Sequence, residues 1–149
     1  MPDTKGASEH VAYEIRMFFA THGLLIGEAV PPGPLHDAVL ESFAVHLRNL
    51  VEFAFDAPER DDVRAEHYFS DPKTWRELRY GKPDDLDRAQ KQANKQISHL
   101  TYARIGADKR WYVGGLAFKL HEYIRIFLDN AEEARMGEEL LEAKRIVRP

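Results

Sequence analysis

The sequence predicts an all-α protein: a four-helix bundle with a long, partly helical connection between its second and third helices and a short C-terminal helix. Three observations support this fold class. Apolar residues recur at helical spacing in four segments. Stretches that contain proline and glycine separate these segments. No stretch alternates between apolar and polar residues as a half-buried strand does. The 149 residues are expected to form one domain, with its core from about residue 8 to residue 136.

The first two helices are predicted over residues 8–28 and 35–55. Ser8 can cap the first helix by accepting a hydrogen bond from a free backbone N–H. Residues 31–34 interrupt the pattern, because proline lacks the backbone donor that a helix interior needs. The two apolar faces comprise Val11, Ile15, Phe18, Phe19, Leu25 and Ile26 in the first helix, and Val39, Leu40, Phe43, Leu47, Leu50, Val51 and Ala54 in the second.

Residues 56–83 form the connection, which prolines and a glycine punctuate. We expect residues 61–64 and 73–78 to make one or two helical turns each. Three aromatic residues, Tyr68, Phe69 and Trp75, are expected to hold the connection against the bundle. A connection of this length is uncommon, which indicates that it has a structural or functional role.

The third helix is predicted from Asp84 to about Arg104, with Gly106 closing it. Acidic residues in its first turn interact favourably with the positive end of the helix dipole. Its inward face comprises Leu86, Ala89, Ala93, Ile97 and Leu100.

The fourth helix is predicted from Asp108 to about Met136, with an apolar stripe of Val113, Leu116, Leu120, Ile124, Phe127 and Ala131. Gly114 and Gly115 each lower helix propensity by about 1 kcal/mol relative to alanine. We expect them to allow close packing against a neighbouring helix. Gly137 precedes a short C-terminal helix.

Composition excludes several classes of protein. The chain has no cysteine, which excludes disulfides, thiolate catalysis and cysteine zinc sites. Its N-terminal residues lack the apolar segment of a signal peptide, and no apolar run is long enough to cross a bilayer. We therefore expect a cytoplasmic protein without a membrane partner.

Motifs for cofactors and metals are also missing from the sequence. It has no glycine-rich phosphate loop, no nucleophile elbow and no His-Glu-x-x-His or Glu-x-x-His pair. The seven histidines are scattered over different segments. The sequence therefore predicts no cofactor and no metal site.

A basic stretch is the main functional signal in an otherwise acidic chain. The formal net charge is −4, but residues 88–110 contain six Lys or Arg and only one acid. Helical spacing places Arg88, Gln92, Lys95 and His99 on one strip, with Tyr102 at its edge. A histidine among cations is expected to be neutral near pH 7, so it can take a proton from a ribose hydroxyl while a cation stabilises the phosphate. The alternative is a solvated helix face with a boundary histidine.

Residues 93–99, Ala-Asn-Lys-Gln-Ile-Ser-His, resemble the Arg-Asn-Lys-x-x-Ala-His signature of the HEPN superfamily. Residues 46–53, His-Leu-Arg-Asn-Leu-Val-Glu-Phe, resemble an earlier helix that is common in that superfamily. The resemblance implies a small helical bundle that forms a homodimer, with one site built from the signature helices of two subunits. Many members are metal-independent ribonucleases of toxin–antitoxin, abortive-infection and related defence systems. On this resemblance, Asn94, Lys95 and His99 are the candidate catalytic residues.

The chain departs from that signature at one position. Ala93 stands where the superfamily has its catalytic arginine, and Ala93 belongs to the inward stripe. Three interpretations remain open. The first is a non-catalytic or weakly active HEPN-like domain that binds RNA, a nucleotide or a protein. The second is a structural or protein-interaction bundle, and the third is a metal-independent ribonuclease that uses His99. The candidate binding residues are Arg88, Gln92, Tyr102, Arg104 and Arg48.

Overall fold

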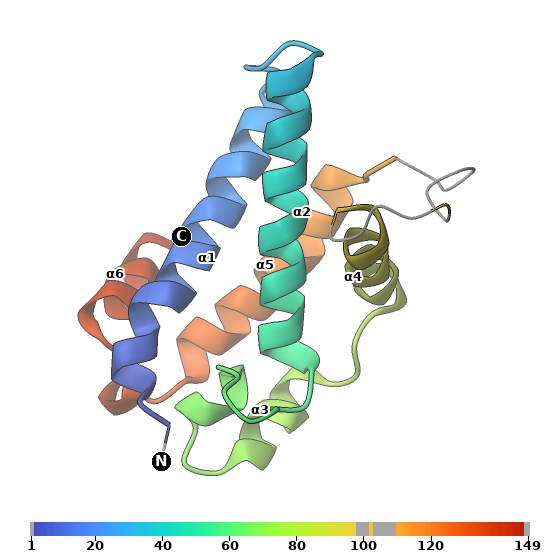
Figure 1. Cartoon of the computed structure of the whole chain (residues 1–149). Helices are drawn as coiled ribbons and strands as arrows, with labels where there is room; N and C mark the ends of the chain where they lie inside the picture. The colour runs from blue at the N-terminus through green and yellow to red at the C-terminus, as the bar shows by residue number, and fades with distance from the viewer. Residues whose placement is uncertain (1, 98–101, 103–109, 148–149) are drawn as a thin grey trace.

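The computed structural model describes residues 2–97, 102 and 110–147, and in these residues the chain is helical without any strand. The all-α prediction is confirmed for this part of the chain. The elements shown in Figure 1 are α1 (Thr4–Ile26), α2 (Pro34–Phe55), the 3-10 helix η1 (Ala65–Tyr68), α3 (Pro72–Arg79), α4 (Asp84–Gln96), α5 (Val113–Asn130), the 3-10 helix η3 (Glu133–Arg135) and α6 (Glu138–Val147).

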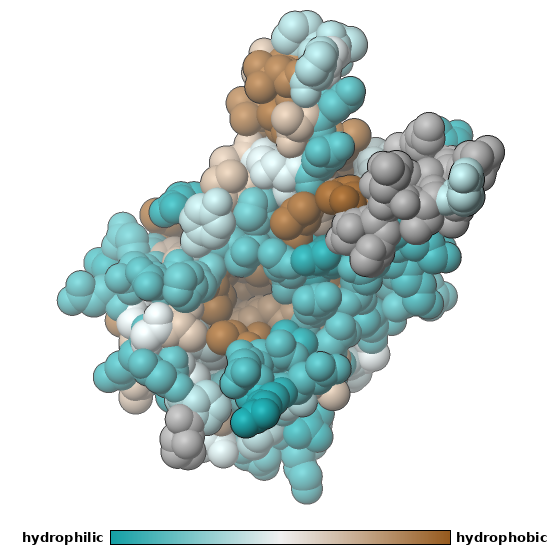
Figure 2. Space-filling view, in the orientation of Figure 1, coloured by the Kyte–Doolittle hydropathy of each residue, from teal (hydrophilic) through white to brown (hydrophobic). Residues whose placement is uncertain are grey.

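Helices α1 and α2 form a long antiparallel hairpin (Figure 1). The chain reverses just before Pro34, where Gly33 takes a φ of 147° that residues with a side chain rarely adopt. Pro34 begins α2, at a position where its missing N–H is not needed. Figure 2 shows apolar side chains exposed towards the tip of this hairpin, and Leu24, Ile26 and Leu35 are exposed there.

The predicted cap of α1 is wrong. The helix begins at Thr4, and the Asp3 side chain caps it by accepting a hydrogen bond of 2.9 Å from the Gly6 backbone N–H. Ser8 lies one turn inside the helix, where it is buried and its hydroxyl donates to the Thr4 carbonyl at 2.7 Å. Ser8 serves tertiary packing instead, because it also accepts a hydrogen bond from the Gly137 backbone N–H before α6.

The core lies where α1, α2 and α5 meet the connection between α2 and α4. Phe127 of α5 is at the aromatic centre of the core. Four other rings pack edge-on against it: those of Phe53, Tyr68, Phe69 and Trp75. The predicted apolar faces of α2 and α5 are buried over most of their length. The prediction fails for Ile26, which is 58% exposed because the last turn of α1 belongs to the hairpin tip.

The connection between α2 and α4 packs as predicted, although one of its predicted helical turns is wrong. Tyr68, Phe69 and Trp75 are buried, and the Trp75 indole N–H donates to the Ala54 carbonyl at 2.7 Å. The connection is therefore held to the end of α2. Residues 62–64 are not helical, and the first turn is η1 instead. The predicted turn at residues 73–78 is α3, capped by the Asp71 side chain.

Helices α4 and α5 are shorter than predicted. α4 begins at Asp84 as expected but ends at Gln96, and the rest of its predicted length lies outside the described residues apart from Ile97 and Tyr102. α5 ends at Asn130 instead of Met136, since the chain turns into η3. Gly114 and Gly115 are exposed, and no neighbour among the described residues lies within 4 Å of where a Cβ would stand at either glycine. The expected close packing at these glycines is therefore wrong.

The short C-terminal helix is present as α6, and it packs against α1. At its start, a Cβ on Gly137 would lie 2.7 Å from the Lys5 carbonyl oxygen, so only glycine permits this close approach. Within the part of the chain that the structure describes, no helix has the length and apolar character needed to cross a membrane.

Candidate functional site

Helix α4 presents the predicted basic strip. Arg88 and Lys95 are exposed, and Gln92 lies half-buried between them, one turn from each. Asn94 is half-buried on a neighbouring face. The opposite face carries Leu86, Ala89 and Ala93, which are buried in the core. His99, the fourth residue of the strip, and the candidate binding residue Arg104 lie outside the described residues.

The alanine at position 93 lies on the buried face of α4. Ala93, at the signature's arginine position, is 1% exposed. An arginine there would place a guanidinium group in the apolar core, where an unpaired charge is strongly unfavourable. The backbone that holds Asn94 and Lys95 therefore turns position 93 away from the strip.

Charge on α4 is divided between its two halves. Asp84, Asp85 and Asp87 occupy the first turn. The carboxylate of Asp87 accepts a hydrogen bond of 2.8 Å from Lys91, and this bond lowers the pKa of Asp87. Lys91 is therefore paired within the helix. Arg88 and Lys95, on either side of it in the sequence, form no such ion pair among the described residues.

A closed polar network fixes the start of α4 against the end of α2. The Lys82 ammonium group donates to Asp56 and to the Gln90 side-chain oxygen, both at 2.7 Å. The Gln90 amide in turn donates to the second Asp56 oxygen at 2.8 Å. Gln90 is buried, so the network satisfies polar groups that would otherwise lack partners. It holds the helix with its cationic face outward.

Two tyrosines that follow α4 in the sequence, Tyr102 and Tyr112, are exposed. The Gln92 amide donates to the Arg110 carbonyl at 3.1 Å, which ties the segment entering α5 to the middle of α4. Tyr112, two residues further along, is 68% exposed, and Tyr102 is 91% exposed. Nucleic-acid bases can stack on exposed aromatic rings.

Arg48, which the sequence also suggested for binding, lies in a separate cluster between α1 and α2. Its guanidinium donates to the Asn49 side-chain oxygen at 3.1 Å, and the Asn49 amide donates to Glu14 at 3.1 Å. The second Glu14 oxygen is 2.6 Å from Nδ1 of His46, which is buried. The Tyr13 ring packs edge-on to His46. This cluster joins the two long helices through a carboxylate that bonds to both an amide and an imidazole.

Sequence reasoning missed the Glu14–His46–Asn49 cluster. Glu14 lies more than thirty residues before His46 and Asn49 in the chain, so no local spacing connects it to them. The available signal in the sequence was that Glu14, His46 and Asn49 are polar residues within apolar stretches of α1 and α2. An imidazole held by a carboxylate has its tautomer and orientation fixed, which suits a histidine either for structure or for proton transfer.

Two further histidines, His22 on α1 and His121 on α5, have lowered pKa values. Burial lowers the pKa of both, and His121 lowers that of His22 further. Both are therefore neutral near pH 7. Even so, no group of three or more potential metal ligands occurs among the residues that the structure describes.

No protein-family model matches this chain, and neither a characterised protein nor a solved structure shows significant similarity to it. Its function must be inferred from its own residues.

Proposed function

We propose that this protein is a divergent HEPN-like domain that binds single-stranded RNA through α4 and does not cleave it. The proposal takes α1, α2, α4 and α5 as the four helices of the bundle, and it places the protein in a cytoplasmic defence or toxin–antitoxin setting. The HEPN-like signature at Asn94, Lys95 and His99 supports the choice of RNA. The burial of Ala93 supports the absence of catalysis, because no arginine side chain joins the signature at that position.

One observation carries the RNA-binding proposal: Arg88 and Lys95 are exposed on one face of α4 and have no ion pair in the described part of the chain. Seven residues separate them, so they lie about 10 Å apart along the helix axis. That spacing allows two cations to contact different phosphates of one strand. Exposed cations without an ion pair are available to an anionic ligand, and phosphate contacts supply a large share of the affinity for nucleic acid.

The two exposed tyrosines add a second kind of contact. Stacking of a base on an aromatic ring contributes about 1–3 kcal/mol and tolerates any sequence. Tyr112 is positioned next to α4 by the hydrogen bond from Gln92 to the Arg110 carbonyl. The combination of backbone contacts and stacking favours an unpaired strand over a duplex.

Binding is tested by fluorescence anisotropy with a labelled single-stranded RNA of about 16 nucleotides, the upper end of typical site sizes. The double variant Arg88→Gln/Lys95→Gln is expected to bind roughly tenfold more weakly than the wild type. The matched control is Lys5→Gln/Lys73→Gln, which removes two exposed lysines from α1 and α3. Equal affinities for all three proteins, or an equal loss in both variants, would contradict the proposal.

Cleavage is tested separately, with a mixed RNA pool in EDTA and a high protein concentration. Neither the wild type nor His99→Ala is expected to cleave RNA. Cleavage that His99→Ala abolishes would replace the proposal with a metal-independent ribonuclease. If the wild type neither binds nor cleaves RNA, a structural or protein-interaction role takes its place.

A further inference from the structure

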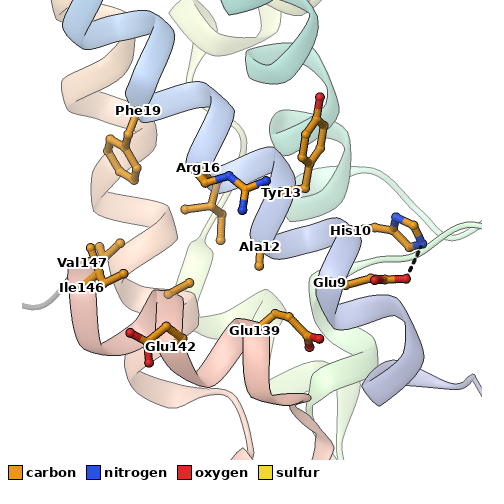
Figure 3. Close-up of a pocket in the computed structure, with 12 residues that line it drawn as sticks. Glu9, His10, Ala12, Tyr13, Arg16, Phe19, Glu139, Glu142, Ile146 and Val147 are labelled. Carbon is orange, nitrogen blue, oxygen red and sulfur yellow. Dashed lines mark ion pairs between the residues drawn. The ribbon is translucent and has the colours of Figure 1, made fainter.

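An open groove of about 610 Å³ runs between α1 and α6 (Figure 3). The two helices lie side by side in the same direction, since Gly137 before α6 donates to Ser8 at one end while Phe19 and Val147 line the other. On α1 the lining extends from Glu9 to Phe19, and ten residues of helix are about 15 Å long. The groove is therefore long enough for about three turns of a further helix.

The floor of the groove is apolar. Ala12 and Ile15 of α1 are buried beneath it, and Phe19 and Val147 are half-buried where it ends. Ile146, on the α6 side, is 73% exposed. Apolar side chains that stay exposed beside such a floor are typical of a surface that a protein partner covers.

The charged side chains that line the groove are unequal in number and in place. There are three glutamates and one arginine: Glu9, Glu139, Glu142 and Arg16. Figure 3 shows Glu9 and Glu139 towards the end where α6 begins, and Glu142 further along α6. Arg16 follows Glu9 by seven residues, so it lies on the same side of α1 and about 10 Å further along the axis. The groove thus has an excess of negative charge and a cation away from its acidic end.

Two of these four charges lack an ionic partner. Arg16 and Glu139 are exposed and have no ion pair within the part of the chain that the structure describes. The Arg16 guanidinium lies over the Tyr13 ring instead, with 5.5 Å between its central carbon and the ring centroid. Tyr13 also lines the groove, so both the cation and the ring are available to an occupant.

The other two glutamates have exposed partners. A ring nitrogen of His10 lies 3.4 Å from the Glu9 carboxylate. Glu142 bonds at 2.7 Å to Arg145, which does not line the groove. Exposed ion pairs contribute little to stability, so a cation from an occupant can replace either partner.

The charges fit a helix that lies antiparallel to α1 and α6. Such a helix presents its first half to Arg16 and its second half to the three glutamates. Acids near the start of a helix and bases near its end are the order that the helix dipole favours. A second copy of α6 has this order but the wrong number of each charge, because its exposed charged residues are three acids and one base: Glu138, Glu139, Glu142 and Arg145. It would bring more negative charge to a groove that already has an excess.

We infer that the α1–α6 groove binds an amphipathic helix of another protein, with an acid near its start and several bases near its end. The apolar stripe of that helix covers the floor and Ile146, as in other complexes where a helix lies in a groove. Its bases contact the three glutamates, and its acid contacts Arg16. The inference is independent of RNA binding, because the residues proposed for RNA lie on α4, and so the two can fail separately.

A synthetic peptide of about 16 residues serves as the probe. It has leucines at helical spacing, one glutamate in its first turn, three lysines in its second half, and alanines elsewhere to favour the helix. The control peptide has the same composition with the two kinds of charge exchanged in place. By fluorescence anisotropy, the wild type is expected to bind the first peptide roughly tenfold more tightly than the second. Equal affinities, or no binding of either peptide, would overturn the inference.

Two substitutions test the contacts in the groove. Ile146→Asp is expected to weaken binding of the first peptide at least roughly tenfold. The matched control is Ile26→Asp, at an exposed isoleucine on the hairpin tip, which is expected to leave binding unchanged. Arg16→Glu is expected to weaken binding of the first peptide and to prefer a peptide whose glutamate is replaced by lysine. A misfolded variant would show no such preference, and its absence in a folded variant, checked by circular dichroism, would contradict the contact with Arg16.

Sedimentation velocity without peptide tests whether a second copy occupies the groove instead. The wild type and Ile146→Asp are expected to have the same mass over a wide range of protein concentrations. A wild-type dimer that Ile146→Asp dissociates would show that the groove holds a second copy, and it would overturn the inference.

Discussion

Helices α4 and α6 carry the same order of charges but use their cations differently. Both begin with acids and have bases in their last turn, an order that the helix dipole favours. In α6 the cations are paired, Lys144 with Glu133 at 2.9 Å and Arg145 with Glu142 at 2.7 Å. In α4, Lys95 has no ion pair within the described part of the chain. The order of charges along a helix therefore does not distinguish paired cations from exposed, unpaired ones. The ion pairs seen in the structure do.

The largest expected effect concerns how firmly the two helices are anchored. Leu86 of α4 and Leu140 of α6 are fully buried. Leu86→Ala and Leu140→Ala are each expected to lower the free energy of unfolding by about 2–5 kcal/mol, because each leaves a cavity in the core. Urea unfolding measures both. A much smaller loss for Leu86→Ala than for Leu140→Ala would show that α4 is only loosely attached, and that its outward face is not fixed.

A smaller effect is expected from releasing the paired cation of α4. Asp87 is ionised at neutral pH, as any ordinary aspartate is, and the Lys91 hydrogen bond lowers its pKa further. This bond pairs Lys91 with Asp87 and so keeps it from other anions. Asp87→Asn is expected to strengthen RNA binding about threefold to tenfold, since it frees a third cation and removes a negative charge. Fluorescence anisotropy measures the change.

The corresponding change on α6 is the control for that prediction. Glu142→Gln releases Arg145 and also removes one negative charge, and we expect no gain in RNA affinity from it. A similar gain in both variants would mean that RNA responds to net charge alone and not to the face of α4.

The smallest effect concerns acid stability at the approach to α6. Hydrogen bonds from the Ser70 hydroxyl, the Ser70 backbone N–H and Arg135 lower the pKa of Glu132 from 4.5 to about 2. A carboxylate with a lowered pKa stabilises the folded state above its unfolded pKa, and this contribution is lost as the pH falls from about 4.5 towards 2. Thermal unfolding of the wild type and Glu132→Gln should therefore differ at pH 6 and converge near pH 2. A constant difference in Tm across this range would contradict the assignment.

Periodicity predicted the faces of the helices well, because the spacing of apolar residues reports burial directly. Leu86, Ala89 and Ala93 are buried on α4, and Arg88 and Lys95 point outward, as their spacing requires. Features that depend on tertiary contacts could not be predicted in this way. Ser8 has the residue type of a cap, yet it contacts Gly137, which lies 129 residues away in the chain.

Polar partners were the least predictable part of the candidate site. Glu14 meets His46 and Asn49 only because α1 and α2 pack as a hairpin. Gly114 and Gly115 suggested close packing, but no neighbour in the described part of the chain lies within 4 Å of where a Cβ would stand at either of them. The four-residue spacing of Asp87 and Lys91 indicates that they can form an ion pair, whereas the lack of an ion pair at Lys95 among the described residues could be learned only from the structure.

The salt dependence of RNA binding tests the central claim most directly. For single strands, the slope of log affinity against log salt concentration changes by about 0.7 for each phosphate contact. If Arg88 and Lys95 each contact a phosphate, Arg88→Gln/Lys95→Gln should reduce the magnitude of the wild-type slope by about 1.4, and Lys5→Gln/Lys73→Gln should leave it unchanged. A slope that is the same in the wild type and in the α4 variant would show that these two cations do not contact RNA.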